Sequence, residues 1–180
     1  MCRIRLGCKC YHSFPLLHDT IAAMKLDTFD KKIIGLLQQD ASLSAAEVGE
    51  RVGLSQSQCW RRIERLEKDG VITQRVALVD RKKVGLDMML FAHVKLNGHS
   101  RNALPEFSAA IQQFPEIMEC HVLLGNVDFL LRLIVPDVHA YERFFFERLS
   151  RLPMVQEVNT MIALSQIKST TVLPLELVDA

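Results

Sequence analysis

A cluster of hydrogen-bonding side chains between Ser55 and Arg65 is the part of this sequence best suited to recognising another molecule. The segment SQSQCWRRIER places glutamine, serine and arginine at helical spacing around the apolar residues Cys59 and Ile63. Glutamine can bond adenine edges, arginine can bond guanine edges or phosphate, and a helix N-terminus favours phosphate. Trp60 lies on the same outward face. The predicted DNA-contacting residues are Ser44, Ser55, Gln56, Ser57, Gln58, Arg61, Arg62 and Arg65.

Two short helices with a tight corner between them would position these side chains. Ser44 followed by Glu47 forms one capping box, and Ser55 followed by Gln58 forms a second. Gly53 stands where a helix needs a left-handed exit. A helical hairpin with a solvated, charged face explains these residues equally well, so the surrounding sequence must decide.

The surroundings favour a winged helix-turn-helix over residues 26–80. Leu26 to Asp40 predicts a preceding helix, with Asp27 as its N-cap. Val71 to Asp80 is rich in β-branched residues and predicts a two-stranded ribbon. Residues 81–87 form a polar connector that suits a domain boundary.

Composition and charge fit a two-domain soluble protein of 180 residues. Hydrophobic residues make up 49% and charged residues 24%, and no apolar run approaches the ~18 residues of a membrane span. Net charge is only +1, but it is unevenly distributed. Residues 27–83 carry 11 basic and 9 acidic side chains, whereas residues 86–180 carry 7 and 11, so the first part is mildly basic.

Residues 88–180 read as a second domain with the element order βαββαβ. Strands are predicted at 88–96, 117–124, 129–135 and 155–165, helices at 102–114 and 137–152, and a short further strand at 170–175. The segments FPEIME at 114–119 and LPMVQE at 152–157 repeat 38 residues apart. The expected class is therefore α+β, with an N-terminal winged helix-turn-helix and a C-terminal ferredoxin-like (RAM-type) domain.

The first predicted strand of this domain has no face suited to water. Met88, Leu90, Ala92 and Val94 alternate with a set in which Met89 and Phe91 accompany His93 and Lys95. A sheet-to-sheet dimer interface explains the mixed second face. A two-fold dimer also suits a helix-turn-helix that reads two half-sites.

The order of these parts resembles the Lrp/AsnC (feast/famine) family of transcriptional regulators. The resemblance extends from Leu26 to about Leu175. It rests on LDTFDKKII at 26–34, LSAAEVGERVGLSQSQCWRRIERLEKDGVI at 43–72, VDRKKVGL at 79–86, ECHVLLGNVDFLLRLIVPD at 119–137 and RLPMVQEVNT at 151–160.

The resemblance implies a cytoplasmic bacterial or archaeal regulator without membrane contact. It implies pseudo-palindromic double-stranded DNA as partner, a homodimer assembled further into tetramers or octamers, and a small effector, commonly an amino acid, at a subunit interface. Asn126 stands where many relatives have an acidic residue, which leaves room for a different effector. The implied effector residues are Gly125, Asn126, Val127, Asp128, Val138, Met161, Ile162 and Ala163.

Asp128 has two interpretations from its chemistry alone. Its carboxylate can pair with the ammonium group of an amino acid, or it can bond backbone in its own turn. The preceding turn residues Gly125 and Asn126 are expected where positive φ is needed, and a glycine lets the backbone approach a ligand closely.

Two other functions compete with regulation. A branch that resembles this family decarboxylates tetrapyrroles, and His93 and His121 would be its candidate acids or bases; bound porphyrin would be visible by spectroscopy. A sensor that no longer binds DNA is the other alternative, and the outward arginines argue against it.

The first 25 residues are expected to be a disordered or non-native extension, because Met24 begins a plausible protein start. Cys2, Cys8 and Cys10 lie there, but their spacing matches no common zinc pattern. We therefore expect no metal site, no cofactor and no catalytic residue.

Overall fold

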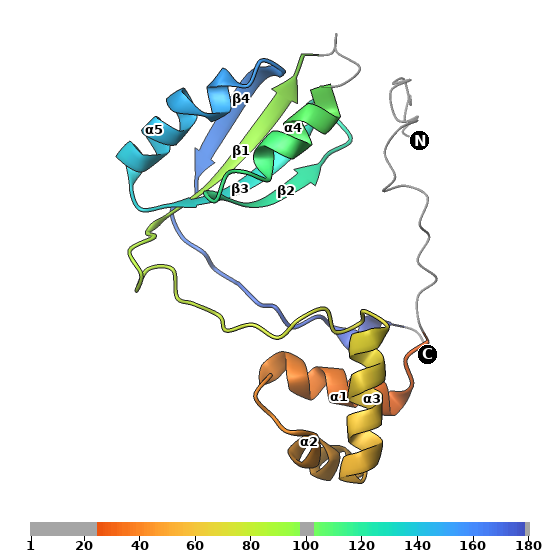
Figure 1. Cartoon of the computed structure of the whole chain (residues 1–180). Coiled ribbons are helices and arrows are strands. Elements are labelled where there is room, and N and C mark those ends of the chain that lie inside the picture. Colours follow the sequence, from red (N-terminus) through yellow and green to blue (C-terminus); the bar gives the residue numbers. More distant parts are fainter. Residues whose placement is uncertain (1–24, 98–102, 179–180) are drawn as a thin grey trace, which may run out of the picture. The chain divides into compact units, whose positions relative to one another are not determined.

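The computed structural model describes residues 25–97 and 103–178, which form two compact units (Figure 1). The helical unit contains residues 25–78 together with 168–178, and the sheet unit contains the described part of 79–167. The predicted N-terminal extension and its cysteines lie outside the described residues.

Three helices build the helical unit: α1 Thr28–Gln39, α2 Ala45–Val52 and α3 Gln56–Lys68. Each begins at a predicted capping residue. The side chains of Asp27, Ser44 and Ser55 accept a hydrogen bond from the backbone N–H three residues on. The side chain of that later residue accepts one from the backbone N–H of the cap, which completes three capping boxes. The three apolar faces meet in one core that contains Ile33, Val48, Val52, Cys59, Ile63 and Leu66.

The corner between α2 and α3 depends on two glycines. Gly53 ends α2 in the left-handed conformation, with φ of 77°, as the sequence predicts. Gly49 permits close packing, because a Cβ added there would lie 2.8 Å from the carbonyl oxygen of Leu54 and 3.4 Å from the Cβ of Cys59. Because Gly49 has no side chain, α3 can pack closely against α2.

The predicted ribbon at Val71–Asp80 is wrong for the described chain. The backbone N–H groups of Val71 and Ile72 both donate to Leu66 O, which ends α3, and the following residues are extended without strand pairing. Residues 73–80 are exposed, and among them Arg75 pairs its guanidinium with Glu67 at 2.9 Å. A β-branched run becomes a strand only when another strand bonds to it, and the described residues supply none.

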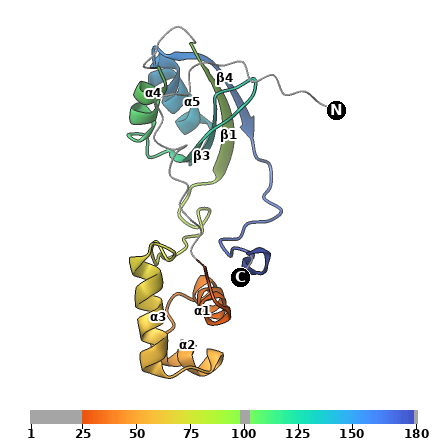
Figure 2. The same cartoon turned by 90° about the vertical axis from the view of Figure 1, so that its right-hand side faces the viewer.

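The C-terminal segment belongs to the helical unit, not to the sheet unit as the 88–180 boundary assumed. We call residues 168–178 the strap. It contains no strand at 170–175 but a 3₁₀ turn at Leu175–Leu177. Leu173 donates its backbone N–H to the Gln38 side chain at 2.7 Å, and Leu175 packs against the helical core. Figure 2 shows this segment beside α1.

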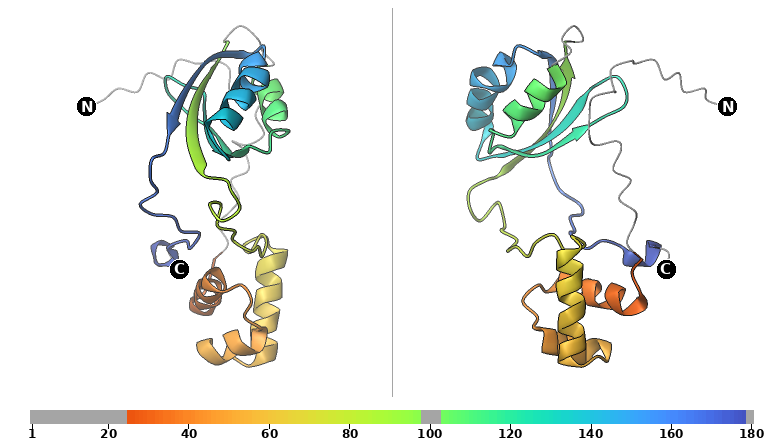
Figure 3. Two further views of the ribbon diagram at one scale, coloured as in Figure 1. Left: turned by 90° about the vertical axis from the view of Figure 1, so that its left-hand side faces the viewer. Right: turned by 45° about the vertical axis from the view of Figure 1, so that its right-hand side comes forward.

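The sheet unit is an antiparallel sheet with two helices on one face, as the βαββαβ order predicts. Its elements are β1 Met88–Leu96, α4 Ala103–Ile111, β2 Ile117–Val122, β3 Phe129–Val135, α5 Val138–Glu147 and β4 Val155–Ile162. The strand order is β2-β3-β1-β4, which is the ferredoxin-like order. Both helices cover the same side of the sheet in the two views of Figure 3.

The repeated FPEIME and LPMVQE segments perform the same task. Ile117 donates its backbone N–H to Phe114 O at 3.1 Å, and Val155 donates to Leu152 O at 2.9 Å. Each segment therefore forms the same turn into a strand, β2 in one case and β4 in the other. The core between sheet and helices includes Leu90, Val94, Phe107, Phe129, Leu131 and Phe144.

Within the described residues, none of the helices has the length and apolar character needed to cross a membrane.

Candidate nucleic-acid interface and ligand site

The buried residues of α3 fix which of its side chains face outward. Cys59, Ile63 and Leu66 are buried against α1 and α2, so the opposite face of the helix carries exposed residues throughout. Gln56, Ser57, Gln58, Trp60, Arg61 and Arg65 are all exposed. The structure thus places most predicted DNA-contacting residues on one helix surface.

Arg62 departs from that prediction. Its guanidinium lies 2.7 Å from Asp27 Oδ2 and 2.7 Å from Asp30 Oδ1, both of which belong to the beginning of α1. These carboxylates raise the pKa of Arg62, first through the hydrogen bond to Asp27 and then through that to Asp30. The guanidinium also lies 5.5 Å from the centre of the Phe29 ring. Arg62 therefore holds α3 to α1 and is not poised to read a base.

Arg65 is engaged by the same carboxylate. Its Nη2 lies 2.6 Å from Asp30 Oδ2, and Asp30 is only 1% exposed. A buried carboxylate needs such partners, because leaving it unpaired would be costly. Asp27 differs in that its side chain is half exposed, and its pKa is lowered first by the hydrogen bond from the Asp30 backbone and further by Arg62.

Several other residues that were predicted to contact DNA form hydrogen bonds within the helix caps. The Gln58 side chain accepts from Ser55 N at 3.1 Å and from Ser55 Oγ at 2.9 Å. Ser57 Oγ lies 3.3 Å from Ser55 Oγ, and Ser44 Oγ bonds Glu47 at 2.7 Å. These four polar residues therefore shape the beginnings of α2 and α3.

Three outward side chains in the first two turns of α3 form no hydrogen bond or ion pair within the described residues: Gln56, Trp60 and Arg61. The DNA-contacting set predicted from sequence left out Trp60. Helical spacing already places it on the outward face, and 54% of the residue is exposed. The chemistry of this surface is thus one amide, one guanidinium and one large aromatic ring.

The predicted effector residues separate into two groups within one chain. Val138, Met161, Ile162 and Ala163 lie where β1 begins, because Met88 pairs with Val135, Leu90 pairs with Ile162 and Ala163 donates to Met89 O. Residues 125–128 lie where β1 ends, because Val94 pairs with Phe129. The seven residues of β3 separate the two groups by about 20 Å. One chain alone does not bring them together.

Asp128 has a structural partner. Its Oδ2 accepts a hydrogen bond from Leu96 N at 2.7 Å, and its own N–H donates to Val94 O at 3.0 Å. This bond lies where the pairing of β1 with β4 shifts register between Lys95 and Leu96. The carboxylate therefore supports the irregular end of β1, a structural role that differs from the bond within its own turn suggested by the sequence.

The expectation of positive φ at Gly125 and Asn126 is wrong. Positive φ occurs in the described chain only at Gly53, Gly70 and Gly85. A Cβ added at Gly125 would meet nothing within 4 Å. Gly125 thus leaves open space beside the turn but is not required by the backbone conformation.

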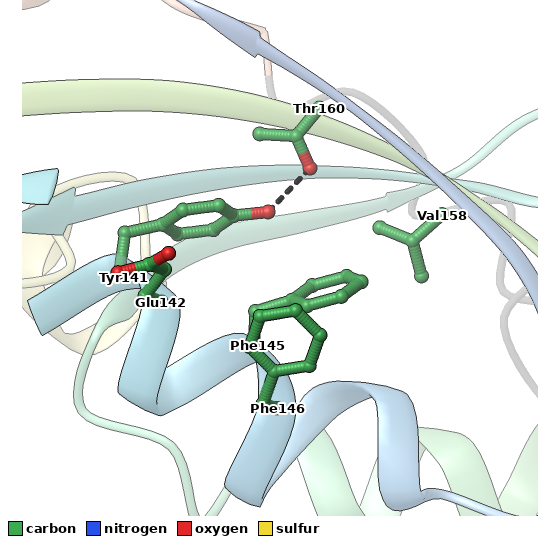
Figure 4. Close-up of a pocket in the computed structure, with 6 residues that line it drawn as sticks. All are labelled: Tyr141, Glu142, Phe145, Phe146, Val158 and Thr160. Atoms are coloured by element: carbon green, nitrogen blue, oxygen red, sulfur yellow. Dashed lines mark hydrogen bonds between the residues drawn. The ribbon is translucent and has the colours of Figure 1, made fainter. Parts of the chain in front are cut away.

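The sheet unit also contains two shallow hollows that the sequence did not predict. One of about 290 Å³ lies between α5 and β4, where the Tyr141 hydroxyl and Thr160 Oγ1 are 2.5 Å apart beside Phe145 (Figure 4). The other, of about 260 Å³, lies near Glu116 and Arg148. None of the eight predicted effector residues lines either hollow.

Within the described residues of the sheet unit, no helix or loop covers the sheet face away from α4 and α5. It carries Phe91 and His93 from β1, with Leu130 and Arg132 opposite them on β3. Arg132 pairs with Glu119 at 2.6 Å, and this bond is the first cause of the lowered pKa of Glu119. The apolar and ionic side chains alternate on one flat surface.

Comparisons with known proteins match both units. The family model for winged helix-turn-helix DNA-binding domains matches residues 26–73, and the family model for the Lrp/AsnC ligand binding domain matches residues 89–173. The glutamate uptake regulatory protein of Zymomonas mobilis is 40% identical over 151 residues, which cover 84% of this chain and 92% of that protein.

Solved structures agree with this assignment. An AsnC family transcriptional regulator from Agrobacterium tumefaciens matches with a TM-score of 0.80 and 41% identity, over 84% of this chain and 98% of that one. A transcriptional regulator from Neisseria meningitidis, solved in complex with L-methionine, matches with a TM-score of 0.81 and 35% identity, over 84% and 97%. The chain belongs to the Lrp/AsnC family of DNA-binding transcriptional regulators.

Proposed function

We propose that this regulator binds operator DNA as a homodimer through the first two turns of α3, and that an amino acid bound between subunits modulates this binding. The observation that carries the proposal is the outward, unpaired set of side chains on α3. The helix that bears them is held to α1 by Asp30, Arg62 and Arg65, so these side chains are presented in a fixed orientation. Preorganised side chains lose less entropy on binding.

The DNA contacts divide by chemistry. Gln56 and Arg61 have unengaged groups that suit adenine and guanine edges or phosphate. Ser44, Ser55, Ser57 and Gln58 organise the helix N-termini, whose backbone N–H groups suit phosphate. In this proposal Arg62 and Arg65 orient the helix, which replaces the DNA-contacting role predicted for them.

A dimer follows from the uncovered sheet face. Phe91 and Leu130 lie next to the Arg132–Glu119 pair, and a second copy of the face would cover the apolar part while leaving the ion pair near its edge. The two-fold axis would then present two α3 helices to the two halves of a pseudo-palindromic site.

The effector is proposed to bind between subunits, because the two predicted groups lie about 20 Å apart along one β3 strand. A neighbouring copy can bring residues 125–128 of one chain to Val138 and Met161 of another. The L-methionine complex of the Neisseria meningitidis regulator and the name of the Zymomonas mobilis relative point to amino acids as the ligand class.

A gel-shift titration with DNA from upstream of the protein's own gene, with and without a pool of amino acids, tests the proposal. We expect salt-dependent binding that the pool alters. Arg61→Ala should weaken specific binding by about 1–3 kcal/mol. Arg143→Ala, on an exposed position of α5, removes the same charge and should leave binding unchanged. Absence of any shift at low salt would contradict the proposal.

Asp128→Asn separates the two roles of that residue. The amide oxygen of asparagine can still accept the hydrogen bond from Leu96 N, so the sheet unit should keep its stability. The lost charge should weaken the response to amino acids if the carboxylate also pairs with an ammonium group. Asp128→Ala, measured by urea unfolding, should instead cost about 1–3 kcal/mol because Leu96 N loses its acceptor. An unchanged amino-acid response in the asparagine variant would assign Asp128 to structure alone.

A further inference from the structure

Trp60 is the one large apolar side chain on the outward face of α3. It lies in the second turn of the helix, one turn after Gln56 and next to Arg61, and 54% of it is exposed. It is not part of the core formed by Cys59, Ile63 and Leu66. A large aromatic ring left in water among polar neighbours is a typical contact for a partner surface.

The core leaves this ring no inward position. Cys59 is completely buried and the preceding corner is tightly packed at Gly49, so α3 cannot rotate about its axis without opening the core. Arg62 and Arg65 hold the same helix to Asp30 from the side that faces α1. Trp60 is therefore fixed on the surface that the proposed function assigns to the DNA major groove.

The major groove offers one apolar group for such a ring to contact. Each base presents hydrogen-bond donors or acceptors there, and thymine alone adds a methyl group at C5. The other polar side chains of this face are engaged in caps and ion pairs, namely those of Ser57, Gln58, Arg62 and Arg65. Trp60 is therefore a major part of the free surface, together with Gln56 and Arg61.

We propose that Trp60 is a specificity-determining residue that contacts thymine methyl groups in each half-site. The proposal rests on the DNA-binding function of α3 and adds to it an apolar term that the polar residues cannot supply. Gln56, one helical turn away, can bond an adenine of the same or a neighbouring base pair. Trp60 and Gln56 together predict that each half-site contains a thymine whose methyl group is recognised in addition to its hydrogen-bonding edge.

The test removes the methyl group from the DNA and the ring from the protein. A high-affinity duplex is first selected from a randomised pool with the full-length wild-type chain. Each thymine of that duplex is then replaced singly by deoxyuridine, which keeps the hydrogen-bonding groups and lacks the C5 methyl. Binding is measured for the wild type, Trp60→Ala and Trp60→Phe, with urea unfolding to verify that each variant is folded.

We expect one thymine per half-site at which deoxyuridine weakens wild-type binding by about fourfold, the value for one buried methyl-sized group. Trp60→Ala should weaken binding to the thymine duplex by about tenfold and abolish the difference between thymine and deoxyuridine there. Trp60→Phe should retain part of the difference. Binding to unrelated DNA at low salt should stay the same in all three proteins, because phosphate contacts dominate it.

Other results overturn the inference. If Trp60→Ala binds the selected duplex as tightly as the wild type, the ring does not contact DNA. If it binds more weakly but keeps the full deoxyuridine penalty, the ring does not read the methyl group. If the wild type selects no duplex at all, the proposed function itself fails, which is a distinguishable outcome.

The chain supplies a direct second readout, because Trp60 is its single tryptophan. Tryptophan emission therefore reports on α3 alone. Adding the selected duplex should shift the emission to shorter wavelength or quench it, whereas an unrelated duplex at moderate salt should not. An unchanged spectrum under saturating specific DNA would place the ring outside the interface.

Discussion

Asp30 joins the two helices that matter most for DNA recognition. Its two carboxylate oxygens bond Arg62 and Arg65 at 2.7 and 2.6 Å, and its position in the first turn of α1 lets it also complete the capping box with Asp27. A pair of charged hydrogen bonds in a buried site restricts rotation of α3 more than apolar contacts alone would. The two ion pairs offset the desolvation cost of the buried carboxylate, and they hold the outward residues of α3 in one orientation.

Gly49→Ala should open the corner between α2 and α3. The new methyl group would lie 2.8 Å from Leu54 O, a distance that backbone must move to relieve. We expect a loss of about 1–3 kcal/mol in urea unfolding, together with weaker DNA binding because α3 shifts.

Gly35→Ala is the matched control. It lies within α1, and an added Cβ there meets nothing within 4 Å. This change should stabilise the protein by about 0.5–1 kcal/mol, as replacing glycine in a helix usually does. Equal effects of the two substitutions would show that the corner tolerates a side chain.

Residue-scale roles were the least predictable from sequence. Spacing alone placed Arg61 and Arg62 together as outward residues, and only the structure distinguishes them, because Arg62 points towards carboxylates 32 and 35 residues earlier in the chain. Asp128 was similar, since its partner Leu96 is 32 residues away. Long-range hydrogen bonds leave no local sequence pattern.

At the scale of elements, local signals predicted most of the structure. The three capping boxes, the glycine exit of α2 and the alternation along β1 and β3 all have their origin in neighbouring residues. The ribbon at 71–80 and the strand at 170–175 were wrong because strands need a partner that composition does not name. The strap instead bonds to α1 through Gln38 and Leu173, which are 135 residues apart in the sequence.

A chain that ends at Lys168 should have a less stable helical unit. It loses the hydrogen bonds between Gln38 and Leu173 and the packing of Leu175 on the helical core. We expect about 1–3 kcal/mol of lost stability, measured as a lower midpoint of the unfolding transition that reports on the helices.

Gln38→Ala in the full-length chain is the milder variant. It should lower the free energy of unfolding by about 0.5–1.5 kcal/mol, because only the hydrogen bonds to Leu173 disappear. A shortened chain that unfolds like the wild type would mean that the strap adds nothing to the helical unit.

At the scale of the whole molecule, two surfaces of the described chain suit the proposed dimer. The open sheet face carries Phe91 near the Arg132–Glu119 pair. The extended segment after α3 exposes Val76, Leu78 and Val79, whose β-branched and leucine side chains suit strand pairing. In the proposed dimer, a second copy would cover the sheet face and supply a pairing partner for the extended segment.

Phe91→Lys should dissociate the proposed dimer, because it places an unpaired charge at the centre of the sheet face. Sedimentation would then report a species near the 20.5 kDa of one chain. Phe146→Lys changes an exposed ring on α5 and should leave the assembly intact. A dimer that survives Phe91→Lys would assign the interface to another surface.

The strap has a consequence for recombination between relatives. The helical unit is built from two separate stretches of chain, and the sheet unit lies between them in sequence. A chimaera that exchanges residues 25–78 alone would set a foreign helical core against the resident Leu175. It would also lose the hydrogen bonds to the Leu173 backbone unless the incoming α1 carries glutamine at position 38. A hybrid regulator that takes its DNA specificity from one parent and its ligand response from another must therefore exchange both stretches together.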